Sequence, residues 1–146
     1  MRNEVFIAAP ARRIFDLAAA TERWPQILPH YRYVRVLELD GDRRVVEMGA
    51  RRNRIPVSWR AEQVNDPVRP HIGFRHVAGW TKGMTVQWVF EPVAGGTRVI
   101  IEHVLDFRFP IAAGFIGRHI VGTFFVHAIA NTTLARMKAL AENNRG

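Results

Sequence analysis

Hydrophobic and polar residues alternate with a period of two through most of the chain after Tyr31, a pattern that predicts β-strands. Three stretches interrupt the pattern with turn-forming residues, at Asp40-Gly41-Asp42, Asp66-Pro67 and Gly95-Gly96. Strands joined by turns this short form an antiparallel meander. We therefore predict six consecutive strands, at residues 31–40, 43–52, 54–65, 69–78, 83–93 and 97–108. Pro56 lacks a backbone N–H, so its place inside a strand pattern indicates a sheet edge or a bulge.

Helical patterns occur near both ends of the chain. After a weakly alternating strand at 2–8, Pro10 suits the first turn of an amphipathic helix over 10–19. Thr21 is a candidate N-cap for a second short helix, which Pro29 ends because the residue before a proline avoids the helical region. Beyond Pro110 the period is helical to about residue 143. The apolar stripe of this long helix is predicted to contain Ile116, Ile120, Thr123, His127, Ala130, Leu134, Met137 and Ala141.

The order of these elements is that of an α+β protein: a strand, two short helices, six strands and one long helix. A seven-stranded antiparallel sheet has one face to bury, and a long amphipathic helix can cover it. Because twisted sheets curl, space remains between sheet and helix, and the two short helices can cap that space. We expect a single domain over residues 1–146 that encloses a cavity.

Composition narrows the class of function. The chain has no cysteine, which excludes thiol chemistry and a disulfide scaffold and fits a reducing cytoplasm. No apolar run reaches the ~18 residues of a membrane span. The formal charge is +8, and the basic residues are densest at Arg51-Arg52-Asn53-Arg54. We interpret this charge as solvated surface and expect no specific nucleic-acid partner. The alternative is a basic face that binds RNA or ribosomes.

Several polar side chains fall on faces that should be buried, and this favours a cavity over a purely apolar core. His103 has the strand parity of inward-facing residues. His119, Thr123, His127 and Asn131 lie on or near the stripe of the last helix. Histidine titrates near neutral pH and suits proton transfer. The alternative for each of these residues is a satisfied position in the core or at its rim.

Two arginines are candidate donors to a ligand, because a guanidinium can polarise carbonyl oxygens. Arg52 shares strand parity with Met48 and is expected to face inward, and Arg54 flanks it. The alternative is a solvated hairpin tip. His30 and Tyr31 follow the second helix, where the mouth of a cavity would lie. The expected apolar walls are Trp24, Leu28, Met48, Trp59, Trp80, Met84, Trp88 and Phe124.

No metal site is predicted. His71 and His76 are five residues apart and do not share a strand face. His119 and His127 are two helical turns apart, and Thr123 between them is not a ligand.

Several motifs occur together along nearly the whole chain. They are Pro10 and Phe15 in the first helix, Trp24-Pro25 and Leu28-Pro29 in the second, Trp59, Met84 and Trp88 in the strands, VAGGT at 93–97 and NTTLARM at 131–137. In these features the chain resembles the START-like (SRPBCC) helix-grip superfamily, and within it the polyketide cyclase/dehydrase group. The resemblance implies a helix-grip fold, a seven-stranded curved antiparallel sheet wrapped around a long C-terminal helix.

The resemblance also implies an activity, that of the aromatase/cyclases of bacterial aromatic polyketide synthesis. These proteins fold a poly-β-ketone chain in the cavity and promote aldol closure with loss of water, without a metal or an organic cofactor. An inward arginine near their third and fourth strands anchors the chain, and in a gapless comparison Ile55 takes its place here. We therefore expect Arg52 or Arg54 as carbonyl anchor, and His103, His127 and Asn131 for proton transfer and polarisation. The expected ligand-binding residues are the apolar walls named above together with His30, Tyr31, His119 and Thr123.

The departure at Ile55 supports a second interpretation, a non-catalytic binding or transport protein for a quinone, a lipid or a sterol-like molecule. In either case the expected partner is a hydrophobic or aromatic small molecule. In the cyclase case, an acidic acyl carrier protein is a further candidate partner that would dock on the basic surface. The sequence leaves open whether the protein is a monomer or a homodimer.

Overall fold

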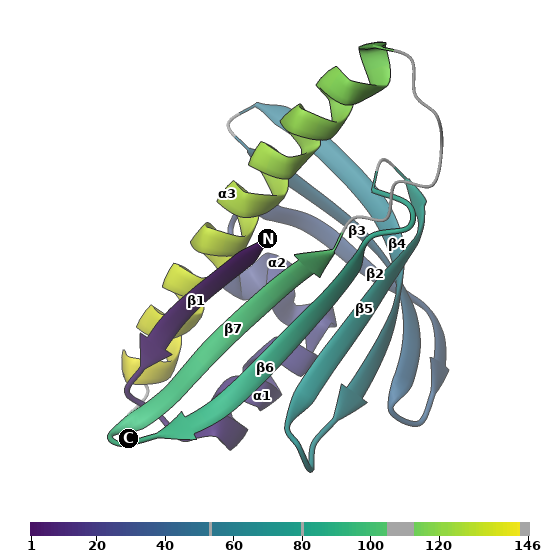
Figure 1. Cartoon of the computed structure of the whole chain (residues 1–146). Helices are drawn as coiled ribbons and strands as arrows, with labels where there is room; N and C mark the ends of the chain where they lie inside the picture. Colours follow the sequence, from purple (N-terminus) through teal and green to yellow (C-terminus); the bar gives the residue numbers. More distant parts are fainter. Residues whose placement is uncertain (53, 80, 105–112, 144–146) are drawn as a thin grey trace.

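Seven antiparallel strands form one curved sheet that wraps around a long helix (Figure 1). The computed structural model describes residues 1–52, 54–79, 81–104 and 113–143, without the side chains of Arg52 and of residues 113–125. The strand order is β1-β7-β6-β5-β4-β3-β2. The strands are β1 (Arg2–Ile7), β2 (Tyr31–Asp40), β3 (Arg43–Arg52), β4 (Ile55–Asp66), β5 (His71–Gly79), β6 (Thr85–Val93) and β7 (Gly96–Val104), and the long helix is α3 (Ala113–Asn143). The predicted helix-grip architecture is confirmed.

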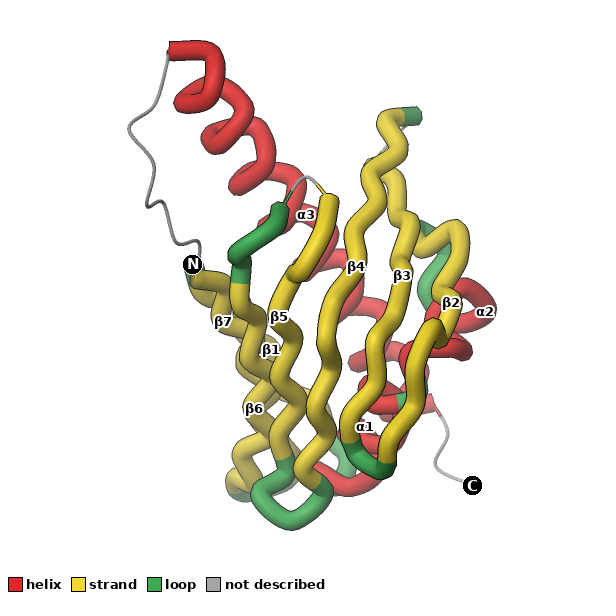
Figure 2. Tube along the Cα trace, turned by 90° about the vertical axis from the view of Figure 1, so that its right-hand side faces the viewer, coloured by secondary structure: helices red, strands yellow, loops and turns green. Residues whose placement is uncertain are grey.

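The two predicted short helices are present on the concave side of the sheet, with α3 (Figure 2). The first is α1 (Ala11–Ala19), and the second is a 3₁₀ turn, η1 (Thr21–Arg23), that continues into α2 (Trp24–Ile27). Leu28, before Pro29, has extended backbone, as predicted. The N-cap prediction for Thr21 is wrong. Its hydroxyl is buried and donates to Gln63 Oε1 at 2.8 Å, so it joins η1 to β4 instead of capping the helix.

Two strands begin two residues later than predicted, because turns occupy their expected starts. Asp66 Oδ1 accepts from the N–H groups of Val68 (3.0 Å) and Arg69 (3.3 Å), and this turn delays β5 to His71. The turn before β6 contains Gly83 at φ 95°, a conformation that favours glycine. The predicted extension of the last strand over 105–108 lies outside the described residues.

Pro56 lies where β4 pairs with a single strand among the described residues. It pairs with Arg51 of β3, and pairing between β4 and β5 begins only at Trp59, opposite Gly79. At Pro56 the strand is therefore a local edge that needs no second backbone donor, as predicted.

Side chains are described at five positions of the predicted α3 stripe, and the face that meets the core differs from the prediction at one of them. Ala130, Leu134, Met137 and Ala141 are buried, whereas His127 is exposed. Val126 and Ile129 occupy the inward positions on the preceding turn. Because one residue is a rotation of roughly 100° on an α-helix, His127 beside an inward Val126 turns out of the core.

Candidate functional site

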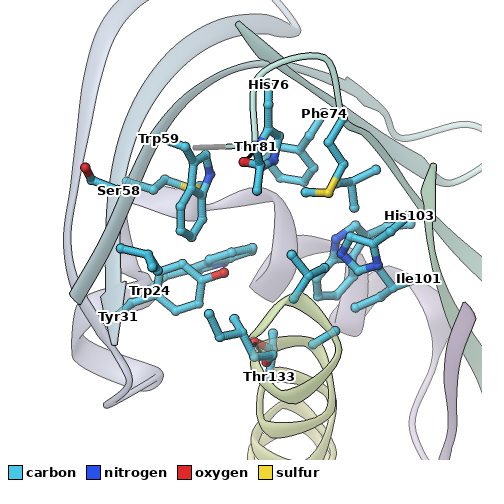
Figure 3. A pocket seen from close by; sticks show the side chains of 18 residues that line it. Trp24, Tyr31, Ser58, Trp59, Phe74, His76, Thr81, Ile101, His103 and Thr133 are labelled. Atoms are coloured by element: carbon cyan, nitrogen blue, oxygen red, sulfur yellow. Dashed lines mark hydrogen bonds between the residues drawn. The ribbon is translucent and has the colours of Figure 1, made fainter. Parts of the chain in front are cut away.

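A cavity lies between the concave face of the sheet and α3 (Figure 3). Its empty space is about 720 Å³, a value that includes the opening to solvent. Strands β2–β7, helix α2 and helix α3 all contribute to its walls, which are mainly apolar and aromatic. Among the lining residues that the structure describes, the polar side chains are Tyr31, Ser58, His76, Thr81, His103 and Thr133.

An aromatic cluster around Trp24 lines one part of the cavity, which we call its floor. Trp24 enters from α2, and its indole Nε1 donates to the Ala18 carbonyl at 3.2 Å, which fixes the ring. The ring lies edge-on to Tyr31, with centroids 4.9 Å apart, and tilted against Trp88 at 5.9 Å and Phe74 at 6.2 Å. These rings give the cavity a rigid apolar floor suited to flat ligands.

His76 on β5 is one of two imidazoles in the wall. Its ring stacks on Trp59 with centroids 5.5 Å apart and planes 7° apart, and its Nδ1 lies 2.5 Å from Thr81 Oγ1. Burial, with a smaller contribution from His103, lowers the pKa of His76 from 6.5 to about 3. The imidazole is therefore neutral near pH 7, and Nε2 is the ring nitrogen left for a ligand.

His103 on β7 is the second imidazole, and it is nine-tenths buried. Burial, helped by the N-terminal amine and by His127, lowers its pKa to about 4. Its Nδ1 is turned into the protein and has no hydrogen-bond partner among the described residues. The ring is neutral near pH 7, and Nε2 is the nitrogen available to a molecule in the cavity.

Hydroxyl groups line the wall opposite the imidazoles. The Thr133 hydroxyl donates to the Ile129 carbonyl at 2.8 Å, so it must accept at its 2.8 Å contact with His30 Nε2. His30 therefore carries its proton on Nε2, and burial lowers its pKa to about 4. Burial raises the pKa of Tyr31, against a smaller opposing effect of the Thr133 hydroxyl, so the phenol stays protonated and can donate.

Seven of the side chains that the sequence suggested lie together around the cavity: Trp24, Tyr31, Met48, Trp59, Met84, Trp88 and His103. Leu28 is fully buried, and His30 lies behind Tyr31 against Thr133. Arg54 is exposed. The backbone of Arg52 pairs with Ile55, while its side chain and those of Trp80, His119, Thr123 and Phe124 lie outside the described residues.

The placement of His127 and Asn131 inside the cavity is wrong. Both side chains are exposed, and both bind Asn3 of β1 instead, at 3.1 Å (Nδ1 of His127) and 2.7 Å (Oδ1 of Asn131). They lie on the side of α3 that faces the edge strand, because the cavity side of this turn is taken by Val126, Ile129 and Ala130.

Sequence reasoning missed four polar lining residues: Ser58, His76, Thr81 and Thr133. A signal existed for two of them. His76 has the same strand parity as the buried Ile72 and Phe74, and Thr133 lies three residues from Ala130 on the buried face of α3. Thr81 lies in a turn, where parity predicts nothing, and Ser58 is on the outward parity of β4.

Within the described ranges, no three His, Asp or Glu side chains gather as metal ligands do. No helix in the described part of the chain is long and apolar enough to cross a membrane.

A family model described as "Polyketide cyclase / dehydrase and lipid transport" matches residues 7–125. A "Putative polyketide cyclase" of Streptomyces halstedii is 34% identical over 101 residues, which are 64% of this chain and 89% of that protein. The actinorhodin polyketide synthase bifunctional cyclase/dehydratase of Streptomyces coelicolor is 28% identical over 139 residues, and the match covers 94% of this chain but 42% of that longer protein.

Solved structures share the fold at lower identity. The Zhui aromatase/cyclase from Streptomyces sp. R1128 superimposes with a TM-score of 0.84 at 20% identity, covering 97% of this chain and 92% of that one. A START superfamily protein from Mycobacterium smegmatis gives a TM-score of 0.71 at 16% identity, covering 96% and 97%. The match of the family model over most of the chain shows that this protein belongs to the polyketide cyclase/dehydrase and lipid transport family.

Proposed function

We propose that this protein binds a poly-β-ketone or aromatic intermediate in its cavity and promotes aldol cyclisation and dehydration. The observation that carries the proposal is the pair of buried, neutral imidazoles, His76 and His103, in an otherwise apolar aromatic cavity. The names of the relatives support the same reaction class. The side chains of the cavity carry the proposal, since fold alone does not choose a reaction.

The proposed chemistry needs one base and one donor. A neutral imidazole takes a proton from a methylene between two carbonyls, the resulting enolate carbon bonds to a second carbonyl carbon, and that carbonyl oxygen receives a proton. Loss of water then needs removal of another proton beside the new hydroxyl, which leaves as water after protonation. We assign the base to Nε2 of His103, and donation to the oxygen to the Tyr31 phenol or to the imidazolium that forms.

The cavity walls meet the remaining requirement, which is to hold the bound poly-β-ketone in a single conformation. The stacked Trp59–His76 pair and the floor around Trp24 restrict a flexible poly-β-ketone to few conformations. Holding the two reacting carbons close together lowers the entropic cost of forming the new bond.

The test is product analysis after incubation with a reactive poly-β-ketone thioester. His103→Gln and His76→Gln should lower the rate of the enzyme-directed product by roughly 10²-fold or more, the usual contribution of a positioned base or acid. His71→Gln is the matched control, because His71 is a half-buried histidine on β5, the strand of His76, and does not line the cavity. If both cavity variants give the wild-type product distribution at the wild-type rate, the assignment is wrong.

Ile55 favours a second candidate function, binding or transport of a hydrophobic molecule without catalysis. Its side chain is 55% exposed, at the position where the resemblance places an anchoring arginine, and Arg54 is exposed beside it. Mass spectrometry of molecules extracted from the purified protein separates the two functions. A co-purifying quinone or lipid, together with no turnover of a polyketone, would favour binding alone.

The proposed delivery partner is an acidic acyl carrier protein, and the positive charge near the cavity-lining residues supports it. Arg32, Arg51, Arg54 and Lys82 are exposed near lining residues. The sequence has no acidic residue at 48–61 or at 67–90. The opposite end of the sheet carries ion pairs such as Arg43–Glu62 at 2.7 Å.

Charge reversal tests this partner. Arg51→Glu with Arg54→Glu should weaken binding of an acidic acyl carrier protein about tenfold or more and reduce its salt dependence, since opposite charges steer such encounters. Arg69→Glu, an exposed arginine in the β4–β5 turn, is the control and should leave the affinity unchanged. Unchanged affinity in the double variant would rule out this docking face.

A further inference from the structure

A buried amide lies at the seam between the edge strand β1 and helix α3. Asn3 is 3% exposed. Its Nδ2 donates to Asn131 Oδ1 at 2.7 Å and to the His127 backbone carbonyl at 3.4 Å, and lies 3.1 Å from His127 Nδ1. These contacts explain why the exposed His127 and Asn131 are held in place, but they use only one end of the amide.

The orientation of the Asn3 amide is fixed by its partners. The His127 backbone carbonyl can only accept, so the atom of Asn3 that faces it must be the nitrogen. The amide oxygen, Oδ1, is therefore turned away from this carbonyl. It is buried and has no hydrogen-bond partner among the described residues. A buried carbonyl oxygen without a partner is costly, so it points to a donor that completes the arrangement.

The nearest inward-facing candidate on the neighbouring strand is His103. Asn3 pairs with Ile101 of β7, and the His103 N–H donates to the Met1 carbonyl at 2.8 Å, so Asn3 and His103 are diagonal neighbours. Diagonal neighbours on one sheet face have Cα atoms ~7–8 Å apart, a separation at which one bridging water can join two side chains that do not touch directly. His103 Nδ1 is the matching buried atom, also without a partner among the described residues.

We propose that Asn3 is a positioning residue: one bridging water accepts the Nδ1–H of His103 and donates to Asn3 Oδ1, and this bridge fixes the His103 tautomer. With the proton held on Nδ1, the lone pair is on Nε2, the nitrogen available to the cavity. A base oriented by a third group is a recurrent arrangement at proton-transfer sites. The catalytic meaning of this tautomer rests on the proposed function, whereas the tautomer itself does not.

Three other titratable groups lie around the same imidazole, and each comes from a different part of the chain. The N-terminal amine of Met1 donates to the His103 carbonyl at 2.9 Å, His76 faces it from β5, and His127 lies on α3. All three disfavour a positive charge on His103 when they are charged. Because the neutral ring can carry its proton on either nitrogen, an acceptor on one side decides which.

The test is ¹⁵N NMR of the histidine rings in the substrate-free protein near pH 7, where the two nitrogens of a neutral imidazole give well-separated shifts. Wild-type His103 should be mainly the Nδ1–H form. Asn3→Leu should shift the tautomer ratio about tenfold toward Nε2–H, the equivalent of one net hydrogen bond of about 1.4 kcal/mol. Lys138→Ala is the matched control, since Lys138 also joins α3 to β1, through the Phe6 carbonyl at 2.8 Å, without touching Asn3.

Two results would overturn the proposal: a wild-type His103 that is mainly Nε2–H, or a ratio that Asn3→Leu and Lys138→Ala change equally. If Asn3→Leu does not fold, Asn3→Asp keeps the acceptor oxygen and adds a negative charge. It should raise the pKa of His103 from about 4 toward its ordinary value, and an unchanged pKa would also overturn the proposal. Because no substrate is present, these results do not depend on whether the protein is a cyclase.

Discussion

Each imidazole of the cavity wall loses hydration on folding without gaining a carboxylate partner, so its charged form is disfavoured. His76 shows this most strongly, with a pKa lowered from 6.5 to about 3. Below about pH 6.5 the unfolded chain binds a proton at this site that the folded chain does not. The stabilising contribution of neutral His76 is therefore complete above that pH and is lost as the pH falls toward 3.

Replacing this one residue should flatten the pH dependence of stability. We expect His76→Gln to reduce the slope of unfolding free energy against pH, between about pH 6 and 4, by up to about 1.4 kcal/mol per pH unit. Urea titrations of both proteins across that range measure the slope. An unchanged slope would mean that the folded imidazole titrates near its ordinary value.

At the scale of elements, a buried polar network joins the short helices to the sheet. Gln63 of β4 is fully buried, and its Nε2 donates to the Ala19 carbonyl at 3.0 Å and to Asn65 Oδ1 at 2.8 Å. Its Oε1 accepts from Thr21, at the start of η1. The network thus sets where α1 ends and where α2 brings Trp24 into the cavity.

Removing the amide should destabilise the fold by more than its size suggests. Gln63→Leu leaves the Ala19 carbonyl and the Thr21 hydroxyl buried without partners, at a cost of roughly 2–4 kcal/mol. Gln26→Leu on the exposed side of α2 is the control and should change stability by less than about 0.5 kcal/mol. Denaturant titration compares them; equal effects would show that Gln63 contributes no more than a surface amide.

The contrast between Thr21 and the strands shows what local pattern can predict. Period-two alternation and turn residues predicted the sheet to within two residues at most ends, because strand parity and turn chemistry are local properties. Thr21 has the residue type of an N-cap, but a partner 42 positions away decides its hydroxyl contact. The prediction for His127 was wrong for a related reason. The apolar pattern of a helix does not fix its buried face to within one residue, because the segment it packs against decides this.

At the scale of the whole molecule, the cavity walls could be predicted better than its polar contacts. Trp24, Trp59, Trp88 and His103 followed from parity and resemblance, and all line the cavity. The partner of each polar group comes from a distant segment, as with Asn3 and α3, so a linear pattern cannot supply it. The exposed arginines near the cavity could be predicted because charge is a property of each residue alone. The buried atoms without partners could not, because their surroundings come from distant segments.

The same substitution at two points of α3 should have opposite effects, because one residue faces empty space and the other faces packed core. Ala130 lines the cavity, and Ala141 is fully buried against the core beyond it. Ala130→Phe should fill the cavity, change the unfolding free energy by less than about 1 kcal/mol, and weaken binding of an apolar fluorescent dye about tenfold or more. Ala141→Phe should cost roughly 1–3 kcal/mol or more through overpacking and leave dye binding to the remaining folded protein unchanged. Dye titration and urea unfolding of both variants measure the two effects. Equal destabilisation with unchanged dye binding would mean that the space beside Ala130 is not the ligand site.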